Sequence, residues 1–442
     1  MLPIVSLLRF LKHVVAATAA ERHSFYAFFF VLFTFLPITS SAKTLEKTTL
    51  TLDEALALSL QSYPLIAARE REYQAAVGDL SAAKWALFPN ASFSFRGFRE
   101  NDTQNALDQE VLIVSQPLWT GGKLSGNISE AAAKRDVAKY AVIEAEQALI
   151  RDTASAFIEM YRAKQKQIIA ARDVTEHERL FDIIQRKVNA STSPEVDLRL
   201  ARARLAFSRA QVLQAGNAME VSRANLEQLV GQAVHHVSVP QRFHAQKPSL
   251  RDAEAAAIAF SPAIRKMQAD IEALAAAAKV ANSALYPQLS VGYEKRFGEL
   301  ATNQEREQVF VGLDFQPGAG LSSRSSGLAS QQRKRAMQDN LLALEREIRR
   351  EVQVAWREFS AAEMQLAPTQ LLVESTSEVM ESYLRQYTVG RKSWLDVLNA
   401  QRELVQAQQA LADHEARVNM ASYKIQILVG NLTKKTVMDQ SE

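Results

Sequence analysis

The sequence predicts a mostly α-helical protein with a small β part, built as two tandem repeats of long helical hairpins plus β-hairpins. Two observations carry this prediction. Four landmarks occur twice in the same order, nearly 200 residues apart, and very long stretches carry apolar residues at helical spacing, with short alternating segments between them. Internal repeats and hydrophobic periodicity are the strongest architectural signals in a single sequence.

The landmarks keep both their order and their spacing. Pro64 and Pro262 lie 198 positions apart, and so do the aromatic-proline pairs that end at Pro89 and Pro287. Gln-Pro begins at 116 and again at 316, with an offset of 200, and Leu-Val-Gly begins at 229 and again at 428, with an offset of 199. We interpret the chain as two copies of one unit.

The first 42 residues have the order of a secretory signal. Basic residues at 9, 12 and 22 precede an apolar run at 25–36, and small residues lead to a cleavage site after Ala42. This run is short for a membrane span, which needs about 20 residues, so cleavage is favoured over an uncleaved anchor. No later stretch reaches 18 apolar residues without a charge. We expect an exported mature chain without a membrane-spanning helix.

Within each repeat, a short helix runs to a proline, which suits the first position of the next helix. A β-hairpin follows, then a very long helix, a turn and a final helix. Apolar residues of the long helices recur at three- and four-residue steps, with charges on the other faces. These are amphipathic helices that pack against other helices, and each of the longest would reach about 100 Å.

The predicted organisation has five parts. They are a signal peptide at 1–42, a first repeat at 43–232, a linker at 233–249, a second repeat at 250–432 and a tail at 433–442. In the first repeat we expect helices at about 53–87, 122–188 and 194–230, and strands at about 91–99 and 109–118. In the second we expect helices at about 250–286, 323–389 and 393–429, and strands at about 288–297 and 307–316.

The alternating segments predict strands in a membrane. In 289–296 and in 309–316, apolar residues line one face; the opposite face carries Ser290, Gly292, Glu294 and Arg296 in the first segment and Gly312, Asp314 and Gln316 in the second. The segment 111–116 is more uniformly apolar. Such alternation is typical of a transmembrane β-barrel. Two hairpins on a soluble core are the alternative, but the long helices leave no sheet face for a core to cover. Four strands cannot close a barrel, and open edges do not persist in hydrocarbon, so several copies must pool strands; three would give twelve.

The composition excludes several function classes. The formal net charge is only +3, without the basic excess of a nucleic-acid binder, and the absence of cysteine removes thiol catalysis and thiolate metal sites. His235 and His236 lack a carboxylate at ligand spacing, and the glycines before Lys123 lack the spacing of a phosphate loop. We predict no enzyme, no catalytic, metal or cofactor-binding residues, and no nucleic-acid partner.

A turn at 387–399 interrupts the helical pattern of the second repeat. Gly390 can end the first helix in the left-handed conformation, and Ser393 can cap the second, with Asp396 three residues on. This turn carries a phenol, two adjacent cations, an indole and a carboxylate. It is either a solvated turn or a functional tip.

With these features in hand, residues of about 50–432 resemble the outer-membrane efflux protein family, the TolC-like exit ducts. The resemblance rests on the double repeat, on Gln-Pro-Leu-Trp-Thr-Gly-Gly-Lys at 116–123, and on Tyr-Thr-Val-Gly followed by Leu-Asp-Val-Leu at the tip. It implies a homotrimer with a twelve-stranded β-barrel in outer-membrane lipid and a periplasmic α-helical barrel. It also implies partners: a periplasmic adaptor (membrane fusion) protein and an inner-membrane ABC or proton-driven pump.

The resemblance also implies a periplasmic gate. In the family, hydrogen bonds and ion pairs between an inner helix pair and its neighbour hold the narrow end shut. By motif, Tyr387 and Lys392 belong to the inner hairpin and Asp197 to the outer one. A charge-assisted bond from Lys392 to Asp197 would be strong yet exchangeable. The family often has arginine where Lys392 stands, and lysine cannot make the bidentate fork.

Four further tip positions complete the expected site. Asp396 matches one of two carboxylates that commonly line the constriction, but Asn399 stands at the other position. One carboxylate ring is a weaker cation trap than two. Trp394 and Arg391 are expected to contact the adaptor or to pack within the tip.

We therefore predict a passive exit channel in the outer membrane of a Gram-negative bacterium, extending into the periplasm. The amino-acid sequence of the tip, Gly-Arg-Lys-Ser-Trp-Leu-Asp-Val-Leu, looks most like that of the type I secretion branch, which exports large adhesins. Small-molecule drug efflux is one alternative, and a soluble periplasmic coiled-coil adaptor is another, from a different class.

Overall fold

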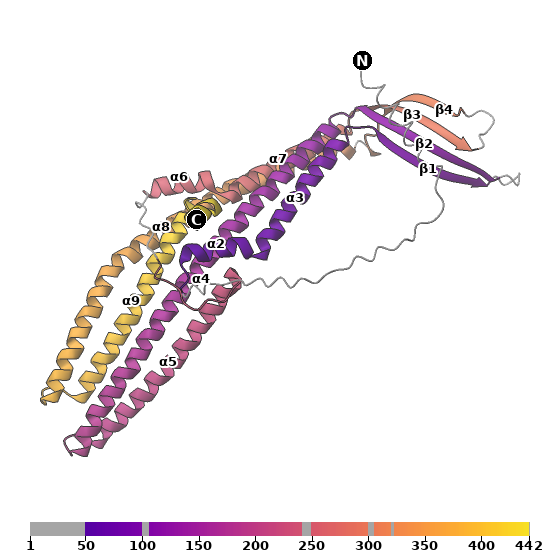
Figure 1. The fold of residues 1–442 in the computed structure, drawn as a ribbon. Helices are drawn as coiled ribbons and strands as arrows, with labels where there is room; N and C mark the ends of the chain where they lie inside the picture. The colour runs from indigo at the N-terminus through magenta and orange to yellow at the C-terminus, as the bar shows by residue number, and fades with distance from the viewer. Residues whose placement is uncertain (1–48, 100–105, 241–248, 299–304, 320–321, 442) are drawn as a thin grey trace, which may run out of the picture. The chain divides into compact units, whose positions relative to one another are not determined.

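The structure is a computed structural model that describes residues 49–99, 106–240, 249–298, 305–319 and 322–441 (Figure 1). The predicted signal peptide lies outside the described residues. The described part of the chain is mostly helical with one small sheet, which confirms the predicted fold class.

The same series of elements occurs twice along the chain. The first repeat contains α2 (Leu52–Ser62), α3 (Pro64–Trp85), β1 (Asn90–Arg99), β2 (Ala106–Trp119), α4 (Lys123–Asn189) and α5 (Glu195–Val230). The second contains α6 (Leu250–Phe260), α7 (Pro262–Ser283), β3 (Gln288–Gly298), β4 (Glu307–Asp314), α8 (Ser322–Thr388) and α9 (Trp394–Leu428). A last helix, α10 (Lys434–Ser441), follows the second repeat.

The repeated landmarks are the points where helices begin and end. Pro64 and Pro262 occupy the first turns of α3 and α7, where a missing backbone N–H costs nothing. Gly231 and Gly430 take left-handed conformations, with φ of 78° and 80°, at the ends of α5 and α9. Glycine suits both places because it has no Cβ to strain.

The two β-hairpins join into one antiparallel sheet with the order β1-β2-β3-β4. The central pairing, β2 with β3, joins the two repeats, and its register shifts between Pro117 and Trp119. β1 and β4 are the edges of the sheet. One face carries exposed apolar side chains, namely Phe93, Phe95, Val309, Val311 and Leu313.

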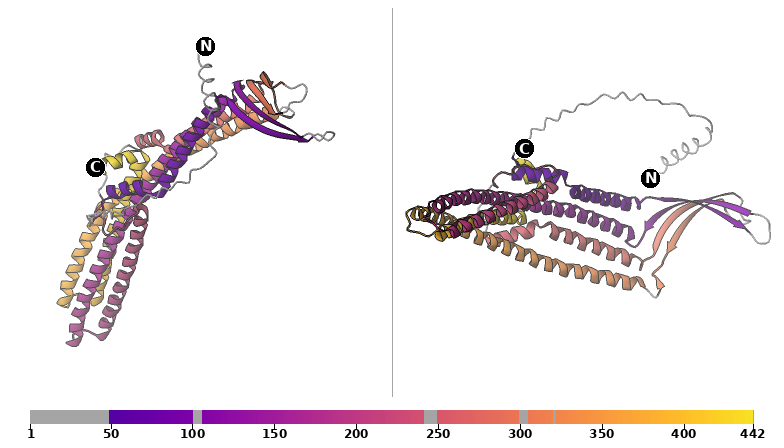
Figure 2. Two further views of the ribbon diagram at one scale, coloured as in Figure 1. Left: turned by 45° about the vertical axis from the view of Figure 1, so that its right-hand side comes forward. Right: turned by 90° about the horizontal axis from the view of Figure 1, so that it is seen from below.

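The helices pack in two sets that share α4 and α8. Next to the sheet, α3, α4, α7 and α8 lie side by side, as the right-hand view of Figure 2 shows. Farther along, α4 and α8 exchange partners: α4 packs on α5 and α9, and α8 packs on α9. Within the residues that the structure describes, none of the helices combines the length and apolarity needed to cross a membrane.

The largest core cluster lies where α2 and α10 pack against α4. It includes Leu56, Phe157, Ile158 and Leu226, each almost completely buried. The sequence predicted 433–442 simply as a tail, whereas the structure has α10 there. Val437 is 1% exposed in the core, and Lys434 Nζ lies 2.8 Å from Glu146 Oε1. With only two apolar residues, Val437 and Met438, α10 has too little periodicity to be predicted.

Part of the predicted linker is also packed. Leu50 forms a parallel bridge with Val237, and the Leu50 N–H donates to the His236 carbonyl at 2.8 Å. Val234 and Val237 are each 3% exposed. His235 and His236 keep exposed side chains.

The burial of Val437 gives a prediction about α10. Val437→Ala should lower the free energy of unfolding by about 2 kcal/mol, since two buried methyl groups are lost and a cavity remains. Thermal unfolding followed by circular dichroism measures this. The matched control is Val239→Ala, because Val239 is 67% exposed. Equal effects of the two substitutions would show that α10 does not pack on the core.

Candidate functional site

The ends of the two helical hairpins meet in a second buried cluster, which we call the tip cluster. It combines side chains of α4, α5, α8 and α9, namely Leu180, Ile184, Leu198, Ala201, Met380, Tyr387, Trp394, Val397, Leu398 and Ala400. The first hairpin turns at 190–194 and the second at 389–393. The cluster therefore fixes the tip of one repeat against the tip of the other within a single copy of the chain.

Tyr387 lies at the centre of this contact. It is 6% exposed, and its ring centroid lies 5.3 Å from that of Trp394, which is 4% exposed. Burial raises the pKa of Tyr387; the nearby Ser193 hydroxyl opposes this, and the charge of Asp197 adds to it. The Tyr387 hydroxyl makes no hydrogen bond of normal geometry with a described residue. It points toward the polar residues of the first hairpin turn.

Lys187, in the last turn of α4, joins the hairpins directly. Its Nζ lies 4.2 Å from the Tyr387 ring centroid and donates to the Tyr387 carbonyl oxygen at 3.3 Å. A helix C-terminus leaves carbonyl groups without helical donors and carries partial negative charge, so a lysine there is favourable. The ring face adds a cation–π contact. We call this contact between Lys187 and Tyr387 the clasp.

The sequence reasoning missed Lys187. Its charge was visible, but its position on α4 gave no sign that it faces Tyr387, since this depends on how α4 is rotated against α8 and α9. The predicted cation, Lys392, lies elsewhere: its Nζ is 4.1 Å from the Tyr383 ring centroid. Among the described residues of one copy, no hydrogen bond or ion pair joins Lys392 to Asp197.

The second hairpin turn has the predicted local chemistry. Gly390 has φ of 81°, and the Arg391 N–H donates to the Gln386 carbonyl at 2.9 Å, which closes the end of α8. Ser393 caps α9 and forms a capping box with Asp396. Both caps that the sequence predicted, Gly390 and Ser393, are confirmed.

Asp396 has a structural partner. Its Oδ2 accepts from the Ser393 N–H at 3.0 Å and from the Ser393 hydroxyl at 2.8 Å. The hydroxyl bond, then the backbone bond, lowers the pKa of Asp396. Asn399 is half-buried on the next turn of α9, and Arg391 is exposed.

A groove of about 380 Å³ lies beside the tip cluster, between α4 and the α8–α9 hairpin. Both signs of charge line it, from Arg172, Glu176, Arg179 and Glu381, together with the amide of Gln401. Gln401 Nε2 donates to Asp173 Oδ1 at 2.9 Å, which is another polar link between the hairpins.

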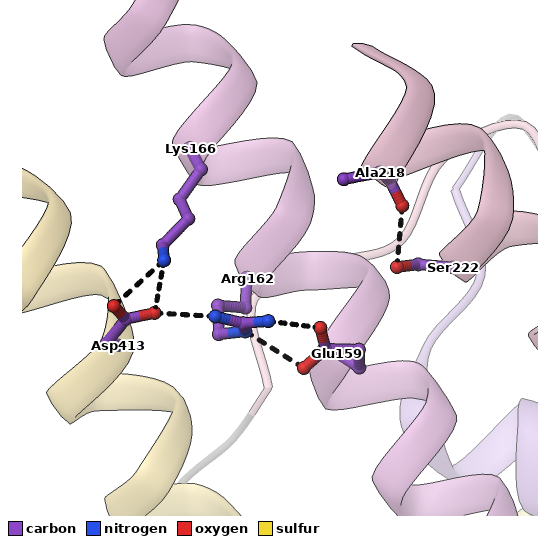
Figure 3. A network of polar contacts seen from close by, with 6 residues as sticks. All are labelled: Glu159, Arg162, Lys166, Ala218, Ser222 and Asp413. Atoms are coloured by element: carbon purple, nitrogen blue, oxygen red, sulfur yellow. Dashed lines mark hydrogen bonds and ion pairs between the residues drawn. The ribbon is translucent and has the colours of Figure 1, made fainter. Parts of the chain in front are cut away.

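Farther from the tips, an ion-pair network joins α4 to α9 (Figure 3). Asp413 of α9 accepts from Arg162 at 2.7 Å and from Lys166 at 2.8 Å, and Arg162 also pairs with Glu159. Burial works against the charge of Asp413, but hydrogen bonds from Lys166 and Arg162 lower its pKa. Polar contacts thus join the two hairpins at the tips and again at Arg162 and Lys166, farther from the tips along α4.

The described residues hold no cluster of three His, Cys, Asp or Glu side chains that could bind a metal ion. The polar groups of the site are ion pairs, caps and ring contacts. These interactions hold helices against one another.

The outer membrane efflux protein family matches residues 55–232 and 255–431, which are the two repeats. The chain belongs to this family. Its members form trimeric channels that work with an adaptor and an inner-membrane pump. The chain is therefore an outer-membrane efflux channel protein of a Gram-negative bacterium and not an enzyme, as predicted. Membership excludes the alternative of a soluble periplasmic adaptor.

Individual relatives agree with this membership. The chain is 21% identical to the outer membrane efflux protein BepC of Brucella suis, over 72% of this chain and 71% of BepC. It is 24% identical to the cobalt-zinc-cadmium resistance protein CzcC of Cupriavidus metallidurans, over 81% and 84%. The solved outer membrane protein VceC of Vibrio cholerae superposes with a TM-score of 0.75 at 15% identity, over 86% of this chain and 96% of VceC. That likeness shows the fold.

The cap at Asp396 gives a prediction about pH. Because its pKa is lowered in the folded protein, its contribution to the start of α9 is complete above the ordinary aspartate pKa of about 4. The contribution is lost only as pH falls through the lowered value. Hydrogen exchange of residues 394–397, corrected for intrinsic rates, should therefore stay constant between pH 8 and pH 5. A rise in exchange already near pH 6 would contradict the cap.

Proposed function

We propose that three copies of the chain form one continuous duct, with a twelve-stranded barrel in the outer membrane and a helical barrel in the periplasm. The observation that carries this proposal is the pair of free sheet edges, β1 and β4, beside an exposed apolar face. Backbone groups at such edges need partners in hydrocarbon, and a neighbouring copy supplies them.

The outer helices support the same assembly. α5 exposes Phe207 at 60% and Leu213 at 76%, and α8 exposes Met364 at 72% and Leu371 at 61%. α5 and α8 lie at the two margins of the packed helices of one copy. A ring in which α5 of one copy meets α8 of the next would cover these side chains.

We further propose that the tips form the gate. Within one copy, the clasp holds the α8–α9 tip against α4. Between copies, Lys392 of one subunit pairs with Asp197 of the next, since the Asp197 carboxylate has no hydrogen-bond or ion-pair partner among the described residues of one copy. Asp396 and Asn399 face the constriction, with Asp396 also serving as a cap. Opening requires the α8–α9 tip to break both the clasp and the contact between Lys392 and Asp197.

The exposed groove and turn suit an adaptor. The mixed charges of the groove favour a polar, exchangeable contact, and Arg391 is exposed in the second hairpin turn. We assign Trp394 a packing role, which its burial in the tip cluster supports. The proposed partner is a periplasmic adaptor that couples the duct to an inner-membrane pump, either an ABC or a proton-driven one.

We propose a large secreted protein, of the adhesin type, as the cargo. The resemblance of the tip sequence at 390–398 to the type I secretion branch supports this choice. The second candidate is small-molecule or ion efflux, and the similarity to an efflux protein, BepC, and to a cobalt-zinc-cadmium resistance protein, CzcC, favours it.

The gate proposal predicts a change in conductance. Lys187→Ala combined with Tyr387→Phe should raise the conductance of trimers in planar bilayers several-fold and admit bulky antibiotics to cells. Lys187→Ala removes both contacts of the clasp, and Tyr387→Phe removes the hydroxyl that lies near Ser193 of the first hairpin turn. Lys392→Ala tests the contact between copies separately. Lys164→Ala is the control, because Lys164 also lies on α4 but away from the tips. Unchanged conductance in the double variant and in Lys392→Ala would remove the gate assignment.

The cargo proposal predicts a selective loss on gene deletion. Cells lacking the chain should retain a large protein that the parent strain secretes, while their susceptibility to drugs and divalent metals stays the same. Comparison of secreted proteins by mass spectrometry, with growth in graded drug and metal concentrations, measures both. Unchanged secretion with increased susceptibility would favour the efflux alternative.

A further inference from the structure

A glycine and a phenylalanine face each other in the second β-hairpin. Gly292 of β3 and Phe310 of β4 are direct partners in the antiparallel register. A Cβ atom placed on Gly292 would lie 2.3 Å from Phe310 Cζ and 2.6 Å from Cε1. The phenylalanine ring therefore lies flat over the backbone of Gly292, and Gly292 is buried beneath it although it has no side chain.

The pair lies on the face opposite the exposed apolar one. Strand residues alternate between faces, so Phe310 points away from the side of Val309 and Val311, which are 74% and 71% exposed. On the Phe310 face, β3 and β4 otherwise carry polar residues and glycine. Arg296 pairs with Glu294 at 2.7 Å, and Gln308 Nε2 donates to Glu294 at 2.9 Å.

Phe310 is thus the one large apolar side chain on this face of β3 and β4. A strand glycine often marks a place where another group must approach closely, and an aromatic side chain over a glycine also restores buried area. Either reason keeps the Phe310 ring against the sheet. The effect of the ring on the width of the duct depends on whether this face of the sheet points toward the lumen.

We propose that Gly292 sets the bore of the barrel by letting Phe310 lie flat against its wall. This inference rests on the proposed function, in which three copies close with the apolar face toward lipid and the Phe310 face toward the lumen. The three rings then lie at one level of the barrel, in contact with the wall. They leave the lumen open to a bulky polypeptide cargo.

Any side chain at position 292 removes this arrangement. The backbones of β3 and β4 are held by ladder hydrogen bonds and cannot separate cheaply, so the ring must change rotamer. Strand side chains in their other rotamers stand away from the sheet. Three rings would then project into the lumen at one level, which narrows the path for large solutes more than for ions.

Neighbouring Ser290 offers a matched comparison. It faces Gly312 in the register, and a Cβ on Gly312 would be 3.1 Å from Ser290 Oγ but 4.0 Å from the nearest Phe310 atom. A leucine at 290 adds the same bulk to the same face, but it can lie over Gly312 without displacing the ring.

The experiment uses trimers in planar bilayers with the gate weakened by Lys187→Ala and Tyr387→Phe, so that the periplasmic end does not limit the current. Polyethylene glycols of graded size are added on the extracellular side. In this background, Gly292→Leu should lower conductance by up to about twofold and exclude the largest polymers that the parent admits. Adding Phe310→Ala to Gly292→Leu should restore both. Ser290→Leu should change them little.

Two results would overturn the inference. One is an unchanged polymer limit in Gly292→Leu; the other is a reduced limit that Phe310→Ala fails to restore, which would indicate a distorted sheet. If Gly292→Leu does not assemble into heat-modifiable trimers, Gly292→Ala replaces it, because the Cβ alone meets the ring. An unchanged polymer limit in Gly292→Ala then overturns the inference.

The lumen assignment is tested separately. The chain has no native cysteine, so single cysteines report their own surroundings. Phe310→Cys should react with a charged, membrane-impermeant thiol reagent in intact outer membranes, and Val311→Cys should not. The reverse pattern would refute the proposed barrel, whereas the expected pattern with an unchanged bore in Gly292→Leu would refute the role of Gly292 alone.

Discussion

The length of α4 and α8 is the constraint on which the rest of the structure depends. Each helix has 67 residues, which corresponds to about 100 Å. An amphipathic helix of this length is stable only if its apolar stripe is covered along the whole course. Shorter helices do this in succession: α3 and α7 near the sheet, then α5 and α9 toward the tips. Where the partners change, α2, α6 and α10 pack on the long helices.

This exchange of partners makes two ends with different properties. At one end the long helices enter strands, whose backbone groups are committed to a rigid ladder. At the other end they enter short turns, held by a small apolar cluster and by single polar contacts such as the clasp. Exposed or half-exposed polar contacts are worth little individually and exchange readily. A duct built this way would be stiff where it meets the membrane and adjustable where it meets a partner.

The tip shows how far residue chemistry can be predicted without a structure. Gly390 and Ser393 act through their own backbone and their neighbours, and both have the predicted roles. Lys187 acts across 200 positions of sequence, and nothing near it in the chain indicates its partner. Lys392, chosen from the motif, lies over Tyr383 instead. The same contrast separates α10, whose burial comes from distant elements, from the helices with strong periodicity.

The sequence by itself determined the helical and strand character of the chain, the double repeat and the family, because periodicity, caps and repeated landmarks are local or internal properties. Only the tertiary structure decided that the two β-hairpins form one sheet, that Lys187 holds Tyr387, and that Phe310 lies on Gly292. These depend on strand register and on the rotation of one helix against another. Register and rotation are set by contacts between distant segments, which no local pattern in the chain records.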